Sequence, residues 1–231
     1  MYDIVFISYD ESSADTNYAA LKARFPMAKR VHGVKGIHQA HIKAAKKCFT
    51  KMFWIVDADA VIMDNFNFDY TVPDHQLDHV HVWRSQNPIN GLEYGYGGVK
   101  LFPRQMTIDM DTSKTDMTTS ISSKFIAVEE TANITAFNTD AFSTWRSAFR
   151  ECAKLSSKTI LRQNDEETGY RLSTWCTKGS ERSFGDYAIA GAIAGREFGI
   201  SNINNISRIN DFDWLKDQFN LHLSKINTEI K

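Results

Sequence analysis

The sequence predicts an α/β fold with a mostly parallel central sheet flanked by helices. Two observations support it. Short β-branched and aromatic runs recur through the first sixty residues, and helical patterns separate them. Strands that alternate with helices pair in parallel, because the crossover between parallel strands needs a connection of helical length. With no internal repeat and no linker, we expect one domain spanning residues 1–231.

Each element of the N-terminal half has a local signal. Ile4-Val5-Phe6-Ile7 forms a buried-strand run, Ser12 or Ser13 is a candidate helix cap, and Gly36 precedes apolar residues at helical spacing. Strands are expected at residues 3–9, 29–32 and 52–56, and helices at 12–24 and 37–49.

The remaining residues are more mixed. Residues 105–124 are polar and poor in large apolar side chains, so we expect a mobile loop there. The stretch after Asp186 is rich in alanine and glycine, which predicts a closely packed helix. Further strands are expected at 79–85, 97–102 and 133–138, and helices at 140–155, from 186 onward and at 212–230.

Composition limits the classes of function. The chain has 42% hydrophobic and 24% charged residues, a net charge of −1 and three cysteines, which is typical of a globular protein in a reducing compartment. No basic leader and no apolar stretch of about 20 residues are present, so we expect a cytoplasmic protein without a membrane partner. Residues 22–51 contain nine lysines and arginines and no acid. This block predicts either a positive face for a phosphate-bearing ligand or a solvated helix surface.

Polar residues follow three of the predicted strands. They occur at residues 9–11, 32–36 and 57–59, and the carboxyl ends of parallel strands meet at one ligand-binding edge. Asp57 and Asp59 are two residues apart, so on an extended segment both face one site. Two such carboxylates fit a hard cation, Mg²⁺ or Mn²⁺, that also takes phosphate oxygens. A turn with two solvated acids is the simpler alternative.

The segments FISYDE, FPMAKRVHGVKGIHQAH and WIVDADAVI resemble GT-A glycosyltransferases that carry a D-x-D motif. Within them they are similar to the phage DNA glycosyltransferases acting on 5-hydroxymethylcytosine and to the base J glucosyltransferase-like family. The resemblance extends through YGYGGVKLFPR, ITAFNTDAFSTWRSAFRECAKL and FGDYAIAGAIAGREFG. It implies a single GT-A (Rossmann-like) domain, whose residues 1–104 bind a nucleotide sugar and whose residues 105–231 bind the acceptor.

The resemblance also implies roles for residues of the donor half. Tyr9 and Asp10 are expected to hold the uracil and ribose of a UDP-sugar. Lys35 and His38, at the start of a helix, are expected to face the phosphates, although Lys35 is otherwise a surface charge and His38 a packed first-turn residue. Asp57 is expected near the ribose or the metal, and Asp59 as a metal ligand.

In the acceptor half, Asp186 is the first candidate for a catalytic base if the reaction inverts the anomeric centre, and an ordinary helix cap is the alternative. Glu130, beside Glu129, is the second candidate. Tyr94 and Tyr96 lie in a glycine-rich loop that either contacts the acceptor or is a plain turn.

Arg146 and Arg150 begin a cationic series that repeats every four residues through Lys154, Lys158 and Arg162. On a helix the series makes a stripe that tracks DNA phosphates or is simply solvated.

These patterns lead to one hypothesis and three alternatives. The hypothesis is a hexosyl- or pentosyltransferase that moves a sugar from a UDP-sugar to the hydroxymethyl group of 5-hydroxymethylcytosine in double-stranded phage DNA, in the host cytoplasm. The base would have to leave the stack to reach the site. The alternatives are a glycosyltransferase with a saccharide or protein acceptor, a nucleotidyltransferase, and a non-catalytic nucleic-acid-binding module.

Overall fold

A computed structural model describes residues 1–95, 98–114, 117–158 and 164–229 of the chain. It divides into two compact units. Unit 1 comprises Met1–Asn87 and Glu93–Ala136, and unit 2 comprises Pro88–Leu92 and Phe137–Lys231. That the whole chain behaves as one domain stays a prediction.

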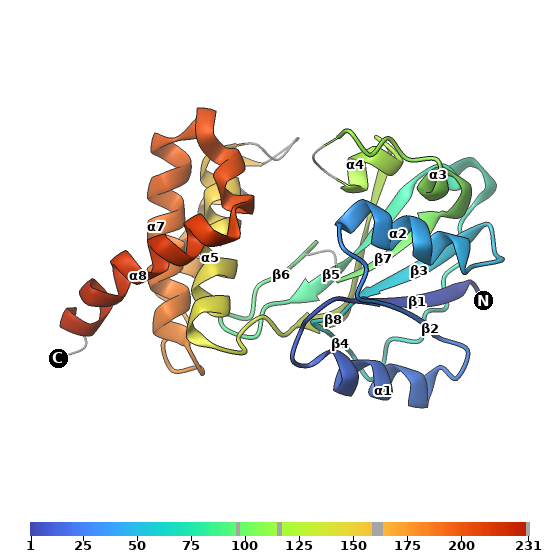
Figure 1. Cartoon of the computed structure of the whole chain (residues 1–231), viewed down its shortest axis with the longest axis horizontal. Helices are drawn as coiled ribbons and strands as arrows, with labels where there is room; N and C mark the ends of the chain where they lie inside the picture. The colour runs from blue at the N-terminus through green and yellow to red at the C-terminus, as the bar shows by residue number, and fades with distance from the viewer. Residues whose placement is uncertain (96–97, 115–116, 159–163, 230–231) are drawn as a thin grey trace. The chain divides into compact units, whose positions relative to one another are not determined.

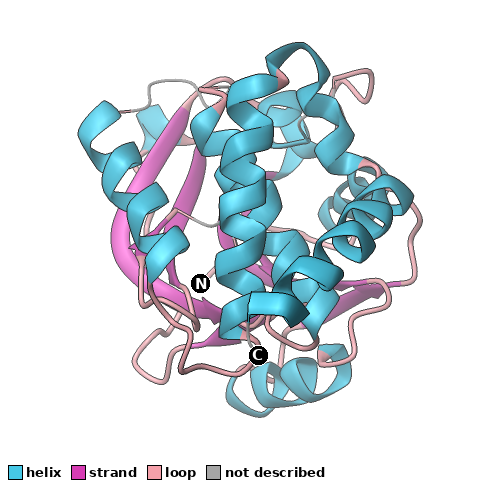
Figure 2. Ribbon diagram, turned by 90° about the vertical axis from the view of Figure 1, so that its left-hand side faces the viewer, coloured by secondary structure: helices cyan, strands magenta, loops and turns pink. Residues whose placement is uncertain are grey.

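Unit 1 is built on a mixed sheet with the strand order β2-β1-β3-β7-β5-β8-β4, and β6 pairs with β5. Strands β1, β2 and β3 pair in parallel, as do β5 and β8, whereas β7 is antiparallel to both β3 and β5. The strands, magenta in Figure 2, form a twisted sheet. Their bounds are Asp3–Ser8 (β1), Lys29–His32 (β2), Met52–Asp57 (β3), Ala60–Ile62 (β4), Val80–Gln86 (β5), Glu93–Tyr94 (β6), Val99–Pro103 (β7) and Phe125–Thr135 (β8).

Helices cover both faces of this sheet, so the predicted α/β fold is confirmed. Helix α1 packs on one face, and α2, α3 and α4 pack on the other (Figure 1). The sheet is less parallel than predicted. Parallel pairing is limited to β1 with β2 and β3, and to β5 with β8, whereas β7 pairs with β3 in the antiparallel sense. The bounds are Ala14–Arg24 (α1), Ile37–Lys46 (α2), Asp74–Gln76 (the 3-10 helix η1), Arg104–Ile108 (α3) and Met117–Ile121 (α4).

Strand β3 is an interior strand of the sheet, paired with β1 and β7, and it is buried on both faces. Trp54 packs with Phe66, Phe68 and Trp83 on the α1 face. On the opposite face Phe53 and Ile55 pack in the cluster that includes residues of α2. Double burial explains why β3 reads as a continuous apolar run rather than as an alternating one.

The expectation of a mobile loop at residues 105–124 is wrong where the short helices α3 and α4 lie, at 105–108 and 117–121. Met110, Met117 and Ile121 are buried in the same cluster as Ile55. A few apolar side chains at suitable positions are enough to pack a polar segment against a sheet. The overall composition of the segment does not reveal such packing.

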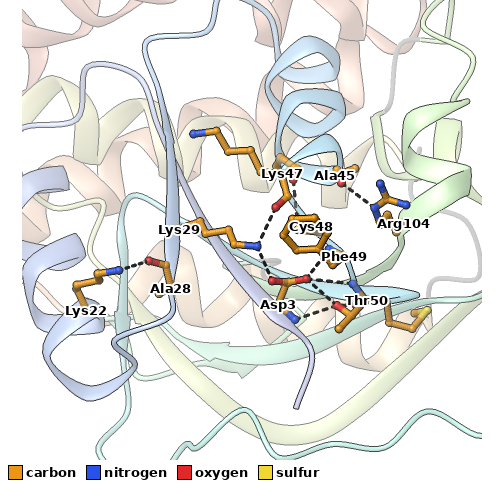
Figure 3. A network of polar contacts seen from close by, with 12 residues as sticks. Asp3, Lys22, Ala28, Lys29, Ala45, Lys47, Cys48, Phe49, Thr50 and Arg104 are labelled. Atoms are coloured by element: carbon orange, nitrogen blue, oxygen red, sulfur yellow. Dashed lines mark hydrogen bonds and ion pairs between the residues drawn. The ribbon is translucent and has the colours of Figure 1, made fainter.

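The amino ends of β1, β2 and β3 are joined by a network around Asp3 (Figure 3). Lys29 Nζ donates to Asp3 Oδ1 at 2.6 Å, and the amides of Phe49 and Thr50 donate to Oδ2 at 2.6 and 3.0 Å. Burial of Asp3 opposes ionisation, but these hydrogen bonds outweigh it and lower its pKa to about 2. One carboxylate therefore connects three separate segments of unit 1.

Replacing Asp3 with Asn should lower stability by about 1–2 kcal/mol at pH 7, because the depressed pKa stabilises the folded state once the group is ionised. That contribution is present above the unfolded pKa near 3.8 and is lost as pH falls toward about 2. Urea unfolding of wild type and Asp3→Asn between pH 2 and 7 measures it. Exposed Asp69→Asn is the control. A wild-type stability profile that parallels that of Asp3→Asn below pH 4 would contradict the assignment.

Unit 2 contains four α-helices and the 3-10 helix η2 within its described residues. Phe142, Trp145, Phe149 and Cys152 are buried on α5, as its apolar spacing predicts. Helix α6 was not predicted. The three cysteines of the chain are free and buried. The bounds are Ala141–Ser156 (α5), Asp165–Thr177 (α6), Gly185–Ser201 (α7), Ile203–Asn210 (η2) and Phe212–Glu229 (α8).

Glycines at every fourth position let α7 lie directly on α5. A Cβ on Gly191, Gly195 or Gly199 would come within 2.3, 2.2 or 2.4 Å of a backbone carbonyl oxygen of α5. For Gly195 the nearest atom is the carbonyl oxygen of Phe149. The predicted close packing of the small-residue helix is therefore confirmed.

Replacing Gly195 with Ala should destabilise the protein by about 2 kcal/mol, because the added methyl group meets rigid backbone and the two helices must separate. The better helix propensity of alanine, worth about 1 kcal/mol, opposes this only in part. Urea unfolding followed by tryptophan fluorescence measures the difference. Glu197→Ala, at an exposed position of the same helix, is the matched control. Equal stability of the two variants would show that the helices are not in close contact at Gly195.

Candidate active site at the carboxyl edge of the sheet

The winding of unit 1 changes direction between β1 and β3. From β1 the chain passes through α1 to β2 on one side, and then returns through α2, on the other face, to β3. The carboxyl ends of β1 and β3 thus flank a topological switch point, where open α/β sheets leave a crevice for ligands. We call the residues after β1, β2 and β3, at 9–11, 33–36 and 57–59, the carboxyl edge.

The Asp57-Ala58-Asp59 segment at this edge is held by its backbone. The amide of Asp57 donates to the carbonyl of Gly98 at 2.9 Å, and the carbonyl of Asp59 accepts from the amide of Ala136 at 2.7 Å. Between them, Asn17 Nδ2 on α1 donates to the carbonyl of Ala58 at 2.8 Å. These three hydrogen bonds fix the backbone of the segment, and none of them uses a carboxylate oxygen of Asp57 or Asp59.

A lysine that the sequence interpretation missed joins this pair. Lys100 Nζ on β7 donates to Asp57 Oδ2 at 3.0 Å, and the lysine side chain is only 12% exposed. The sequence signal was a lysine inside the buried-strand run Val99-Lys100-Leu101-Phe102. A charge in such a run is rare unless it has a partner.

Asp59 is a carboxylate under electrostatic strain. Burial, and next the negative charge of Asp57, raise its pKa to about 6, although a hydrogen bond from its own backbone amide and then the positive charge of Lys100 oppose the shift. No described residue forms an ion pair with Asp59. Among the described residues, Lys100 therefore compensates one of the two acids and the second is left without an ion pair.

His41 on α2 is close enough to feel the charges of Lys100 and Asp57, and its imidazole stays neutral. Its Nδ1 donates to the carbonyl of Ile37 at 2.8 Å, and Nε2 is buried. Burial and then the charge of Lys100 lower the pKa of His41 to about 4. Lys100 is thus the cation whose field acts on both His41 and Asp59.

The acidic pair fits a divalent cation of the Mg²⁺ or Mn²⁺ type. Such ions use one or two protein carboxylates and complete their shell with waters and phosphate oxygens. Asp59, whose ionisation is opposed by Asp57, is the kind of ligand whose charge a cation would relieve. Within the described residues, no group of three or more His, Cys, Asp or Glu side chains could hold a metal by itself. The remaining ligands would therefore come from the substrate and water.

The predicted nucleotide-binding residues lie at the same edge. Tyr9 is 54% exposed and follows β1 directly, with its amide donating to Glu11 Oε2 at 2.7 Å. Asp10 is exposed beside it. Ile7 is the residue of β1 paired with Asp57, so Tyr9 and Asp10 follow just beyond that pair at the switch point. Their contact with a base or ribose stays a prediction.

Lys35 and His38 lie at the amino end of α2. Gly36 is the cap residue, with a φ of 91° and no side-chain cap, and Lys35 is exposed before it. His38 is partly buried, and its Nε2 lies 3.3 Å from Ser120 Oγ on α4. Lys35 is thus available to a ligand at this edge, whereas His38 is held against α4.

The positive block at residues 22–51 serves largely internal contacts. Lys22 and Arg24 donate to backbone carbonyls, and Arg30 pairs with Asp15 at 2.6 Å. Lys29 belongs to the Asp3 network. The block is therefore mainly structural, and Lys35 is its contribution to the carboxyl edge.

Glu130 is not brought to the acidic pair. It is exposed on β8, where its Oε2 accepts from Trp83 Nε1 at 3.2 Å. The backbone contact with Asp59 comes six residues further on, at Ala136, beyond the irregular part of β8 that faces Arg84. Tyr94 is buried on β6, and Tyr96 lies outside the described residues.

The other predicted acceptor residues belong to unit 2. Asp186 is exposed in the first turn of α7, whose cap residue is Phe184, so the alternative of an ordinary Asp186 cap is wrong. Arg146 lies over the rings of Phe142 and Phe212, at 5.6 and 4.9 Å from their centroids. Arg150 Nη2 donates to Asn210 Oδ1 at 2.9 Å.

The cationic stripe is shorter than its sequence spacing suggests. Helix α5 ends at Ser156, before Lys158, and Arg162 lies outside the described residues.

Among the described residues, no helix combines the length and apolarity needed to cross a bilayer.

Comparison with known proteins finds no matching family model and no match among curated proteins. Among solved structures, the chain is similar to HddC from Yersinia pseudotuberculosis, with 13% identity over 57% of this chain and 92% of that one and a TM-score of 0.36. It is also similar to the mannosyltransferase PcManGT from Pyrobaculum calidifontis, solved in complex with GDP-Man and Mn²⁺. There the identity is 11%, over 98% of this chain and 84% of that one, with a TM-score of 0.43. At these scores neither similarity assigns a function.

Replacing Asp59 with Asn should stabilise the metal-free protein by about 1–2 kcal/mol at pH 7.5, after allowance for solvent screening. The raised pKa means that the folded state holds its proton up to about pH 6, whereas the unfolded state releases it near 3.8. The contribution of Asp59 to stability therefore falls as pH rises between these values, and the variant should not show that fall. Urea unfolding in EDTA, with Asp69→Asn as control, measures it. A less stable Asp59→Asn protein at pH 7.5 would refute the strained pair.

Proposed function

We propose that this chain is a metal-dependent glycosyltransferase that moves a sugar from a nucleotide sugar to a hydroxyl group. The observation that carries the proposal is the acidic pair Asp57 and Asp59 at the switch point of an α/β sheet, with Lys100 beside it. Nucleotide sugars present a base, a ribose and a diphosphate. The carboxyl edge offers exposed Tyr9 and Asp10 on one side of the switch point and the acidic pair on the other.

The chemistry that such a site must supply is charge neutralisation of a leaving diphosphate. Asp57 and Asp59 would hold a Mg²⁺ or Mn²⁺ ion, which supplies Lewis-acid stabilisation of that diphosphate when bound. The chain's own residues do the rest: the amino end of α2 and Lys35 favour an anion at the same edge. The hydrogen bonds donated by Ala136 and Asn17, and the one accepted by Gly98, keep the acidic segment rigid.

The finer proposal concerns donor and acceptor. We propose a UDP-sugar as donor and the hydroxymethyl group of 5-hydroxymethylcytosine in double-stranded phage DNA as acceptor, which rests on the sequence resemblance. Arg146 and Arg150 on α5 are the proposed contacts with phosphates, and Tyr94 and Tyr96 the proposed contacts with the acceptor. Asp186 is the proposed base, because it is exposed in the first turn of a long helix, and Glu130 is the second candidate.

A nucleotide-release assay tests the proposal. Purified protein with Mn²⁺ is given UDP-sugars and GDP-sugars, together with duplex DNA that contains or lacks 5-hydroxymethylcytosine. We expect UDP release only with the modified DNA and a metal. We also expect Asp59→Asn to lower it at least about 100-fold, the scale of losing one charge-stabilising group at the reacting centre. Asp69→Asn, exposed on a loop of unit 1, should leave it unchanged.

Other outcomes assign other functions. Release with a saccharide or protein but not with DNA would keep the glycosyltransferase and reject the DNA acceptor. Release of pyrophosphate from a nucleoside triphosphate and a sugar phosphate, supplied in place of the nucleotide sugar, would identify a nucleotidyltransferase. Metal-independent DNA binding without release from any donor, unaffected by Asp59→Asn, would indicate a non-catalytic binding module and reject the proposed function.

A further inference from the structure

Lys100 is the one residue of the acidic site whose presence a metal centre does not require. A divalent cation and an ammonium group compete for the same carboxylate, because each is attracted by the negative charge of Asp57. The ammonium nevertheless lies 3.0 Å from Asp57 Oδ2. A lysine in this position weakens metal binding by Asp57, so we expect it to serve a function besides neutralising the carboxylate.

Strand register shows how Lys100 reaches the edge. Its Cα is paired with Ile55 of β3 on one side and Val82 of β5 on the other. Paired residues share a face of the sheet, and Asp57, two residues after Ile55, shares it too. The lysine stem therefore runs along the α2 face over about two residues of strand and delivers its ammonium to the carboxyl edge.

The burial of that stem limits what the ammonium can do. With 12% of the side chain exposed, the group has few alternative positions, and one of its three hydrogens is used by Asp57. No other described residue accepts a hydrogen bond from Lys100, so the other two hydrogens remain for an acceptor that enters from solvent. Both local carboxylates repel an anion, so only a ligand that arrives with a divalent cation would be accepted there.

We propose that Lys100 is a diphosphate-binding residue, positioned by Asp57, that donates to a phosphate oxygen of the nucleotide sugar. This inference rests on the proposed function and adds to it a residue from β7. The charges then balance in steps. The acidic pair and Lys100 sum to −1, and a divalent cation makes this group +1. Glu11, whose negative charge also acts on Asp59, adds to the repulsion of an anion before the cation binds. A diphosphate is therefore attracted only after the cation has bound. Lys100 thereby opposes metal binding in the absence of nucleotide and favours nucleotide binding in its presence.

Removing the charge should therefore move two affinities in opposite directions. In Lys100→Met, Mn²⁺ should bind about fivefold more tightly without nucleotide, because a competing positive charge is gone. UDP should bind about tenfold more weakly at saturating Mn²⁺, the scale of one hydrogen bond to a charged group. Electron paramagnetic resonance of free Mn²⁺ measures the first affinity and titration calorimetry measures the second, with UDP and, in parallel, GDP as probes.

Control variants separate charge from packing. Lys100→Arg keeps the charge and should retain most of the UDP affinity, and Lys100→Gln provides a second neutral variant if Lys100→Met fails to fold. Lys46→Met removes an equal charge from an exposed position on α2 and should change neither affinity.

Two results would overturn the inference while leaving the proposed function intact. In the first, UDP affinity is unchanged in both neutral variants, which makes Lys100 a counter-ion only. In the second, both affinities fall together, which indicates a structural role. Wild-type protein that binds neither Mn²⁺ nor either nucleotide would overturn the proposed function and the inference with it.

Discussion

The double burial of β3 is the constraint on which unit 1 depends. Its side chains alternate between the α1 face, where Trp54 packs with Phe66 and Trp83, and the α2 face, where Phe53 and Ile55 pack. Because helices cover both faces of β3, its side chains first reach solvent at the carboxyl end of the strand. Asp57, the first polar residue there, is therefore half-buried at the carboxyl edge. The position of the acidic site follows from the packing of the strand that precedes it.

The acidic pair at the carboxyl edge has only one positive partner among the described residues. Asp57 is paired with Lys100, whereas burial and the charge of Asp57 leave Asp59 with a pKa near 6. Stable proteins rarely keep such a pair without a use for it, because it costs stability near neutral pH. At the opposite edge Asp3 shows the contrary arrangement, with its carboxylate fully satisfied by Lys29 and two backbone amides. One fold thus contains an acid that stabilises it and an acid whose charge opposes its stability.

Local signals were enough for most elements. Apolar runs and helical spacing predicted β1, β2, β3, α5 and α7, and the acidic pair was visible as D-x-D after a strand. Other features depend on partners distant in the chain. Helices α3 and α4 form because Met106 and Ile108 of α3 and Met117 and Ile121 of α4 pack on the sheet face beside α2. The residues of that segment alone do not reveal this contact.

The sequence by itself determined the alternation of strands and helices, the place of the two aspartates at a strand end, and the small-residue face of α7, since each depends on neighbours a few positions away. Tertiary structure decided that β7 runs antiparallel beside β3, that the sheet is mixed, and that Glu130 lies far along β8 from Asp59. It also decided that Lys100 meets Asp57 across 43 positions of sequence. Pairing between strands is set by which faces bury the most apolar surface together, and a single chain segment holds no record of that choice.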